Sequence, residues 1–311
     1  MGYLEVTKTY DRSSIYLKPK ASFVNSRDEV DLSVDILNKL RLSIPIIASP
    51  MRGIINPILI RKMDEWGGIG ILHRFCDDKE FLSNLESVSG CSFGVAVGLN
   101  EFDRVKLAVE FSASLICVDV ANGYLQSVKT FCAKIKDKYP DILLMSGNVV
   151  DYEGTKSLND HGVDLIRVGI GTGNLCRTRQ KTKIGFGQFS ALLDCSNADG
   201  YIVSDGGIKE PGDAVLDLAA GADLIMIGSL LAQTFESAHN GKIFGMASRT
   251  NQEEYHHSVK SVEGIEESVQ KTMSFDNFIS EFLYGMKSSF TYQDAKNIRE
   301  LRENAEFVEI L

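Results

Sequence analysis

Eight short apolar runs rich in β-branched residues recur along the chain. Hydrophobic residues follow one another in these runs instead of alternating with polar ones, which indicates burial on both faces, as in parallel strands covered by helices. The runs begin about 22 to 27 residues apart, with one wider gap after the sixth. They are IPIIAS (44–49), GIGIL (68–72), FGVAVG (93–98), LICVDV (115–120), ILLMSG (142–147), DLIRVG (164–169), GYIVSD (200–205) and DLIMIG (223–228).

The segments between these runs are typical of amphipathic helices, for example FDRVKLAVEFSA (102–113) and EPGDAVLDLAAG (210–221). Eight strand and helix units in succession predict an α/β fold, a closed (β/α)8 TIM barrel. The structural alternative is an open doubly wound sheet, which usually has fewer strands, and no GxGxxG follows the first run here. A barrel of this size is routinely one domain, so we expect residues 1–311 to form a single catalytic unit.

Two segments stand outside this regular alternation. The wide gap holds GIGTGNLCRTRQKTKIGFGQFS (169–190), an oversized loop where a barrel of this kind carries its chemistry. Residues 233–272, after the eighth run, are polar and contain glycine, as expected of a flap over a barrel mouth.

Charge and composition narrow the function classes. The net charge of −9 argues against nucleic-acid and membrane partners, because both require a basic surface. No signal segment or membrane-length apolar run is present, so we expect a cytoplasmic protein. The six cysteines form no CxxC pair and no cluster with histidine, which argues against a transition-metal site. We expect all of them except Cys176 to pack in the core.

Cys176 is the candidate nucleophile. It lies in the long loop, close to Gly173 and just before the basic stretch 177–183. Nearby cations and backbone N–H groups stabilise a thiolate over a thiol, and the thiolate is the reactive form. A lone loop cysteine is weak support by itself. Thr178, two residues on, can place its hydroxyl beside the same reacting carbon, or it can make an ordinary turn.

Two strand ends point to a phosphorylated ligand. SDGG (204–207) follows the seventh run, and IGS (227–229) follows the eighth. Phosphate sites of such barrels use the loops after strands 7 and 8, where glycine lets backbone N–H groups approach oxygen. The carboxylate of Asp205 suits a ribose diol, because it accepts from two hydroxyls. A turn or helix-cap role for Asp205 is the alternative.

Seven stretches together resemble the IMP dehydrogenase and GMP reductase family. They are SRDEVDL (26–32), DVANGY (119–124), SGNVV (146–150), DLIRVGIGTGNLCRTRQKTKIGFGQFSAL (164–192), SDGG (204–207), GADLIMIGSLLA (221–232) and FGMAS (244–248). CRTRQKT (176–182), DVANGY and SRDEVDL favour the GMP reductase branch. Only about twenty residues separate His73 from Phe93, so the CBS insertion typical of IMP dehydrogenase is absent.

The resemblance implies NADPH-dependent reductive deamination of GMP, or of a closely related purine nucleotide, to IMP and ammonia. Cys176 would attack C2 of the purine, Thr178 and Glu263 would handle proton transfers, and Asp205 would hold the ribose. The remaining nucleotide contacts implied are Met51, Asn174, Gly206, Gly207, Gly228, Ser229, Gly245, Met246, Ala247 and Lys260.

The resemblance also implies contacts with the cofactor and with other copies of the chain. Arg74, Asp119, Arg179 and Lys181 would meet NADPH, and forked guanidinium donors suit its phosphates. A homotetramer is implied as well. A monovalent cation such as K+ near Gly171, Gly173 and Cys176 stays open.

Departures from the family pattern leave the substrate and two other functions open. Arg52 stands where the family has an acid, Asn174 where it has a serine, and Lys260 where it has an arginine. A deoxy or modified purine nucleotide therefore remains an alternative to GMP. IMP dehydrogenase is a second alternative, although the arginine and tyrosine pair that its flap needs is absent from 249–272. A catalytically silent nucleotide-binding barrel is the third; retention of Cys176, Thr178 and Asp205 argues against it.

Overall fold

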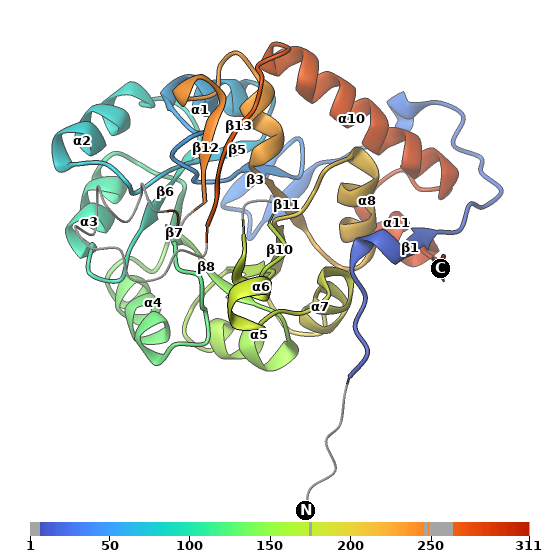
Figure 1. The fold of residues 1–311 in the computed structure, drawn as a ribbon, viewed down its shortest axis with the longest axis horizontal. Coiled ribbons are helices and arrows are strands. Elements are labelled where there is room, and N and C mark those ends of the chain that lie inside the picture. The colour runs from blue at the N-terminus through green and yellow to red at the C-terminus, as the bar shows by residue number, and fades with distance from the viewer. Residues whose placement is uncertain (1–6, 174–175, 246–247, 249–263, 311) are drawn as a thin grey trace, which may run out of the picture.

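The computed structural model describes residues 7–173, 176–245, 248 and 264–310, and its centre is a closed barrel of parallel strands (Figure 1). The strands follow one another around the barrel in chain order, and pairing of Met226 with Ile47 closes it. Each of the eight predicted runs coincides with one strand, although β8 continues two residues past its run, so the predicted barrel is confirmed. The strands are β4 (Ile46–Ala48), β5 (Ile69–Leu72), β6 (Phe93–Val97), β7 (Leu115–Val118), β8 (Leu143–Val149), β9 (Leu165–Val168), β10 (Tyr201–Asp205) and β11 (Leu224–Ile227).

Helices cover the outside of the barrel, and polar caps fix where several of them begin. The side chains of Asn56, Asp77 and Asp151 each accept a hydrogen bond from a backbone N–H in the first turn of the following helix. The helices are α1 (Pro57–Glu65), α2 (Asp78–Ser87), α3 (Phe102–Glu110), α4 (Gln126–Lys138), α5 (Tyr152–Asn159), α6 (Thr178–Thr182), α7 (Gln188–Cys195), α8 (Pro211–Ala219), α10 (Phe275–Tyr292) and α11 (Ile298–Asn304). None of the helices in the described ranges is both long and apolar enough to span a bilayer.

Two apolar layers fill the molecule, one between strands and helices and one inside the barrel. The inner layer includes Ile36, Leu40 and Leu42 from a hairpin that the sequence did not lead us to expect. Its strands, β2 (Val34–Ile36) and β3 (Leu40–Leu42), lie at the amino ends of the barrel strands, where Tyr201 Oη donates to the Asp35 carbonyl. The hairpin therefore seals one end of the barrel and leaves the site at the other.

Several smaller elements lie around the barrel. At the N-terminal side, η1 (Arg12–Ser14) leads into β1 (Ile15–Leu17), which pairs antiparallel with β14 (Phe307–Glu309), and η2 (Arg27–Glu29) follows. After β11 come η3 (Ser229–Gln233), η4 (His239–Gly241) and an antiparallel ribbon of β12 (Lys242–Phe244) with β13 (Glu266–Ser268).

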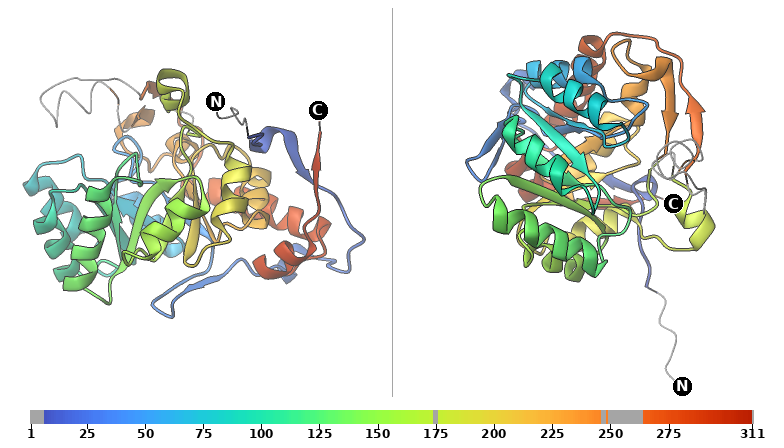
Figure 2. Two further views of the ribbon diagram at one scale, coloured as in Figure 1. Left: turned by 90° about the horizontal axis from the view of Figure 1, so that it is seen from below. Right: turned by 90° about the vertical axis from the view of Figure 1, so that its left-hand side faces the viewer.

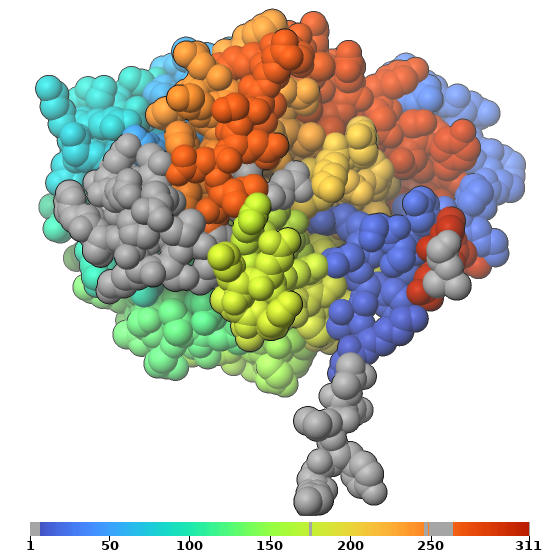
Figure 3. All heavy atoms as spheres, in the orientation of Figure 1, coloured from blue at the N-terminus to red at the C-terminus, as the bar shows by residue number. Residues whose placement is uncertain are grey.

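The ribbon and α6 project on the same side of the barrel (Figures 1 and 2). In Figure 3, α6 lies between the ribbon and the N-terminal segment. The ribbon falls within the predicted flap, residues 233–272. The covering role of that flap stays a prediction, because residues 249–263 lie outside the described ranges.

Candidate active site

Three charged side chains form a layer inside the barrel at the carboxyl ends of its strands. Strand side chains alternate in direction, so Cys117 and Asp119, Leu165 and Arg167, and Val203 and Asp205 are pairs that share one face. Cys117, Leu165 and Val203 belong to the inner apolar layer, so all three pairs face the interior. Each charged residue therefore follows an apolar one toward the open end.

Arg167 joins the two carboxylates of this layer. Its Nη1 donates to Asp119 Oδ1 over 2.8 Å, and its Nη2 donates to Asp205 Oδ2 over 2.8 Å. Burial opposes the charge on Arg167, but the carboxylates of Asp205 and Asp119 outweigh it, so the pKa of this guanidinium lies above its usual value. The Arg167 and Asp119 side chains are 5% and 1% exposed, so this ion pair is shielded from solvent.

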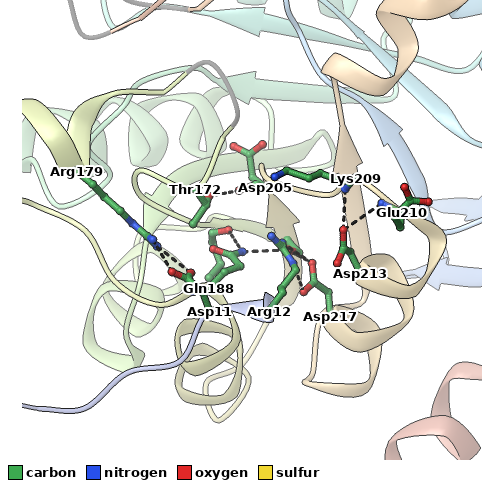
Figure 4. A network of polar contacts seen from close by, with 12 residues as sticks. Asp11, Arg12, Thr172, Arg179, Gln188, Asp205, Lys209, Glu210, Asp213 and Asp217 are labelled. Carbon is green, nitrogen blue, oxygen red and sulfur yellow. Dashed lines mark hydrogen bonds and ion pairs between the residues drawn. The ribbon is translucent and has the colours of Figure 1, made fainter. Parts of the chain in front are cut away.

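Asp205 keeps one oxygen available toward the open end. Its Oδ2 accepts from Asn148 Nδ2 over 2.8 Å and from Arg167, whereas Oδ1 has no hydrogen bond among the described residues. The side chain is 15% exposed, and its carboxylate points away from Arg12 and Asp217 (Figure 4). An oriented carboxylate with one free oxygen suits the predicted ribose contact.

Glycine turns follow β10 and β11 at the predicted phosphate loops. Gly206 and Gly207 have φ angles of +91° and +80°, in the left-handed region that favours glycine. A Cβ at Gly207 would lie 2.6 Å from the Thr172 carbonyl oxygen, so the two loops approach closely there. A Cβ at Gly228 would lie 2.5 Å from Met51 Sδ, which places Met51 beside the start of η3. Ser229 is the first residue of η3.

Cys176 is exposed on the loop after β9, as predicted. Its Sγ lies 3.2 Å from Thr178 Oγ1, so the structure brings the two predicted catalytic side chains together. Thr178 begins α6, and Cys176 forms an isolated antiparallel bridge with Gly264 at the edge of the ribbon. The chain between β9 and α7, residues 169–187, carries Cys176 and is called the cysteine loop below. This loop therefore meets the described end of the predicted flap at Gly264.

The other cysteines are less accessible than Cys176. Burial raises the pKa of Cys76, Cys117 and Cys195 to about 12, and that of Cys132 to about 11. The predicted core packing is confirmed for these four, which are buried. The prediction is wrong for Cys91, which is only half-buried, although burial again raises its pKa. A thiol with a raised pKa forms little thiolate at neutral pH, so these five sites are poor nucleophiles.

Three buried polar atoms without a hydrogen bond lie beyond the ends of β5 and β7. They are His73 Nδ1, Arg74 Nε and Asp119 Oδ2. Arg74 Nε and Asp119 Oδ2 are 3.8 Å apart, too far for a good hydrogen bond. Burial, with the charges of Arg52, His239 and Arg104, lowers the pKa of His73 to about 4. Unsatisfied buried donors and acceptors are costly, so their presence here fits a polar ligand such as a nicotinamide cofactor.

The structure places some of the remaining predicted site residues and does not describe others. Gly245 is buried, and its N–H donates to the Ile265 carbonyl across the ribbon. Lys181 is exposed on α6, whereas Arg179 on the same helix forms an ion pair of 2.7 Å with Asp11. Five predicted residues lie outside the described ranges: Asn174, Met246, Ala247, Lys260 and Glu263. Their roles stay predictions.

The sequence did not lead us to single out Arg167, Asn148 or a buried polar cluster under the phosphate loops. In that cluster, Arg12 donates to both carboxylate oxygens of Asp217 over 2.7 and 2.6 Å, and Ser204 Oγ donates to Asp217 Oδ2 (Figure 4). A single charge inside an apolar strand was the available signal for Arg167. Arg12 could not be predicted, because its partner Asp217 lies 205 positions away and leaves no local pattern in the sequence.

The barrel, the exposed cysteine after its sixth strand and the glycine turns after its seventh and eighth define a (β/α)8 protein whose candidate site lies at the carboxyl ends of the strands. The family model described as the IMP dehydrogenase / GMP reductase domain matches residues 7–311, and the chain belongs to that family. Among the described residues, no group of three or more His, Cys, Asp or Glu side chains is arranged to hold a metal ion.

Three curated relatives, all called GMP reductase, cover the chain completely. The Onchocerca volvulus protein is 32% identical over 349 residues, which span 100% of this chain and 93% of the relative. The Caenorhabditis elegans protein is 31% identical over 337 residues, 100% of this chain and 94% of the relative. GMP reductase 1 of Mus musculus is 31% identical over 336 residues, 100% of this chain and 97% of the relative.

Proposed function

We propose that this protein catalyses the NADPH-dependent reductive deamination of GMP to IMP and ammonia. The observation that carries the proposal is the exposed Cys176 thiol beside Thr178, on a loop next to the glycine turns. The names of the relatives support the reaction, and the family supports a nicotinamide cofactor.

In this proposal the nucleotide is fixed at its sugar and phosphate. Asp205 Oδ1 accepts from the ribose hydroxyls, while Asn148 and Arg167 hold the carboxylate through Oδ2. The backbone N–H groups around Gly206, Gly207 and Gly228 bind the phosphate oxygens. With the ribose and the phosphate held, C2 of the base faces the loop that carries Cys176.

The proposed chemistry begins with Cys176. The thiolate adds to C2 of guanine, and the 2-amino group leaves as ammonia after it gains a proton, with Thr178 and Glu263 handling the proton transfers. NADPH, when bound, supplies the hydride that C2 receives as the carbon–sulfur bond breaks. Cys176 is then released for another turnover.

The residues beyond β5 and β7 are proposed to hold the cofactor. Arg74 donates to a phosphate or hydroxyl oxygen, and Asp119 Oδ2 accepts from an amide or hydroxyl group. Lys181, exposed on α6, offers a further cation. The guanidinium of Arg179 already pairs with Asp11, so it is the least suited of the predicted cofactor contacts.

The test is to follow NADPH absorbance with GMP for the wild type and Cys176→Ala. We expect turnover to fall at least about a thousandfold, while the Kd for GMP changes less than about threefold, because the thiol acts in the transition state and the sugar and phosphate contacts supply ground-state affinity. Cys91→Ala, which alters a half-buried thiol, should retain turnover. Substantial activity of Cys176→Ala would contradict the covalent mechanism.

The same assay separates the alternatives. Oxidation of IMP with NAD+ in place of GMP reduction would identify a dehydrogenase, and nucleotide binding without turnover would identify a silent barrel. Faster turnover with NADH than with NADPH would refute the cofactor assignment.

Assays in KCl and in NaCl test the predicted cation, and light scattering tests the predicted homotetramer. The single-domain organisation and the cytoplasmic location also stay predictions.

A further inference from the structure

The side chain of Arg179 passes between the two ends of the cysteine loop. Gly171 lies at the start of this loop, after β9, and Gly185 lies at its end, after α6. A Cβ at either glycine would collide with Arg179 Cγ. The methylene stem of Arg179 therefore packs against both ends of the loop at once, where only glycine leaves room for it.

The guanidinium of Arg179 ends in contacts that fix the same two ends. Its Nε donates to the Ile170 carbonyl over 3.4 Å, and Nη2 donates to the Phe186 carbonyl. Nη1 and Nη2 also donate to the two carboxylate oxygens of Asp11 over 2.7 and 3.2 Å. This is a forked pair, the geometry in which arginine is most directional.

Asp11 is itself held against the start of α7. Its Oδ1 accepts from the backbone N–H of Gln188 over 2.9 Å (Figure 4). Burial disfavours the charge on Asp11, but the hydrogen bonds from Arg179 and Gln188 outweigh burial and hold its pKa below the usual value. Asp11 is therefore a fixed anion and not a freely moving surface group.

The residues before Asp11 dock on the same helix start. Tyr10 and Ser190 exchange two hydrogen bonds, Tyr10 N–H to Ser190 Oγ over 2.8 Å and Ser190 N–H to the Tyr10 carbonyl over 3.2 Å. The Gly187 N–H donates to Thr9 Oγ1 over 3.3 Å, and a Cβ at Gly187 would collide with the Tyr10 backbone. The segment 9–12 thus lies against the chain that leaves the cysteine loop.

We propose that Asp11 is a positioning residue for Cys176 and acts through Arg179. Arg179 follows Thr178 directly in α6, and Thr178 contacts the Cys176 thiol. Fixing Arg179 therefore fixes the helix turn that places both groups. The proposal rests on the proposed function, because its kinetic consequence requires turnover at Cys176.

The kinetic test compares Asp11→Asn, Asp11→Glu and Lys8→Ala. Asp11→Asn removes the anion, so we expect kcat for GMP to fall about tenfold or more with KM for GMP changed less than about threefold, since small displacements of a reacting group cost rate. Asp11→Glu keeps the carboxylate and should recover most of the lost kcat. Lys8→Ala removes the exposed ion pair with Glu309 and the contact of the ammonium with the Tyr10 ring, just before the segment, but leaves Asp11 and Arg179 in place, and should leave kcat unchanged.

Stability should hardly respond in these variants. The Arg179 and Asp11 side chains are 32% and 45% exposed, and such pairs contribute little to the free energy of unfolding. We expect the melting temperature to change by less than about 3 °C. A large fall in melting temperature together with equal losses in all three variants would show a general structural role instead and overturn the proposal.

A second readout does not depend on turnover. Limited trypsin digestion should cut wild-type protein slowly after Arg177, Lys181 and Lys183, and several times faster in Asp11→Asn, because opening of the loop sets the rate of cleavage. The rate at which iodoacetamide labels Cys176, located by peptide mapping, should differ from wild type in Asp11→Asn and not in Lys8→Ala. If both readouts and kcat are unchanged in Asp11→Asn, the proposal is wrong. If the loop readouts change while wild-type protein does not reduce GMP, the proposed function fails and the loop anchor stands.

Discussion

Replacing His73 with Gln is expected to remove an acid-sensitive part of the stability. His73 is 7% exposed, and its Nδ1 is buried with no hydrogen bond among the described residues. Burial, together with the charges of Arg52, His239 and Arg104, lowers its pKa from 6.5 to about 4. The folded protein therefore resists protonation at this position, while the unfolded chain does not.

The sign and size of the stability change follow from the difference between the pKa of His73 in the folded protein and its pKa in the unfolded chain. As pH falls below 6.5, the unfolded chain binds a proton first, so the stability that His73 contributes is present above pH 6.5 and is lost as pH falls toward 4. A gap of about 2.5 pH units, at about 1.4 kcal/mol each, gives a loss of ~3.5 kcal/mol. About 2 kcal/mol of this is already lost at pH 5.

Urea unfolding at pH 8, 6 and 5 measures this effect in the wild type and in His73→Gln. The difference at pH 8 reports only the altered packing and serves as the internal control. Between pH 8 and pH 5 the wild type should lose about 2 kcal/mol more of its free energy of unfolding than the variant does. Parallel pH dependences of the two proteins would refute the reasoning.

Two further substitutions test the buried charges, and a third tests the proposed sugar contact. Arg167→Met leaves Asp119 and Asp205 without their shared cation and should lower the free energy of unfolding by ~3–5 kcal/mol in urea titrations; a loss below about 1 kcal/mol would contradict the buried ion-pair assignment. Arg12→Met leaves the fully buried Asp217 without its cation and should lower the free energy of unfolding by a similar ~3–5 kcal/mol. The thermal midpoint measures this loss, and an unchanged midpoint would contradict the prediction. Asp205→Asn should weaken GMP binding more than binding of its 2′-deoxy analogue in calorimetry, and equal losses would remove Asp205 from the sugar site.

The barrel could be predicted because its strands are buried on both faces. Runs such as LICVDV (115–120) are apolar without alternation, and the segments between the runs show amphipathic helix patterns, apart from the long loop after the sixth run. The β2–β3 hairpin was missed since Val34–Ile36 and Leu40–Leu42 are only three residues each, too short to show a pattern. Its packing against the barrel interior depends on tertiary contacts.

The site was predictable where local composition carried the signal. Cys176 was found from the unusual length and basic character of its loop, and Asp205 from the two glycines that follow it. The partners of Arg179 were not predictable, because Asp11 lies 168 positions away in the sequence. A basic loop residue has the same appearance in a sequence whether it binds a phosphate or anchors its own loop.

The pairing of β1 with β14 bears on the order in which the parts of this protein fold. The strand Ile15–Leu17 directly follows the segment that docks beside the cysteine loop, and its partner Phe307–Glu309 is made nearly 300 residues later. During synthesis the barrel strands can assemble while β1 still lacks its partner. Contacts of such long sequence separation carry the largest chain-closure cost, so they form late. Emerging chains would therefore hold the barrel strands before β1 gains its partner, so the segment 9–12 would be fastened at its β1 end only late in folding.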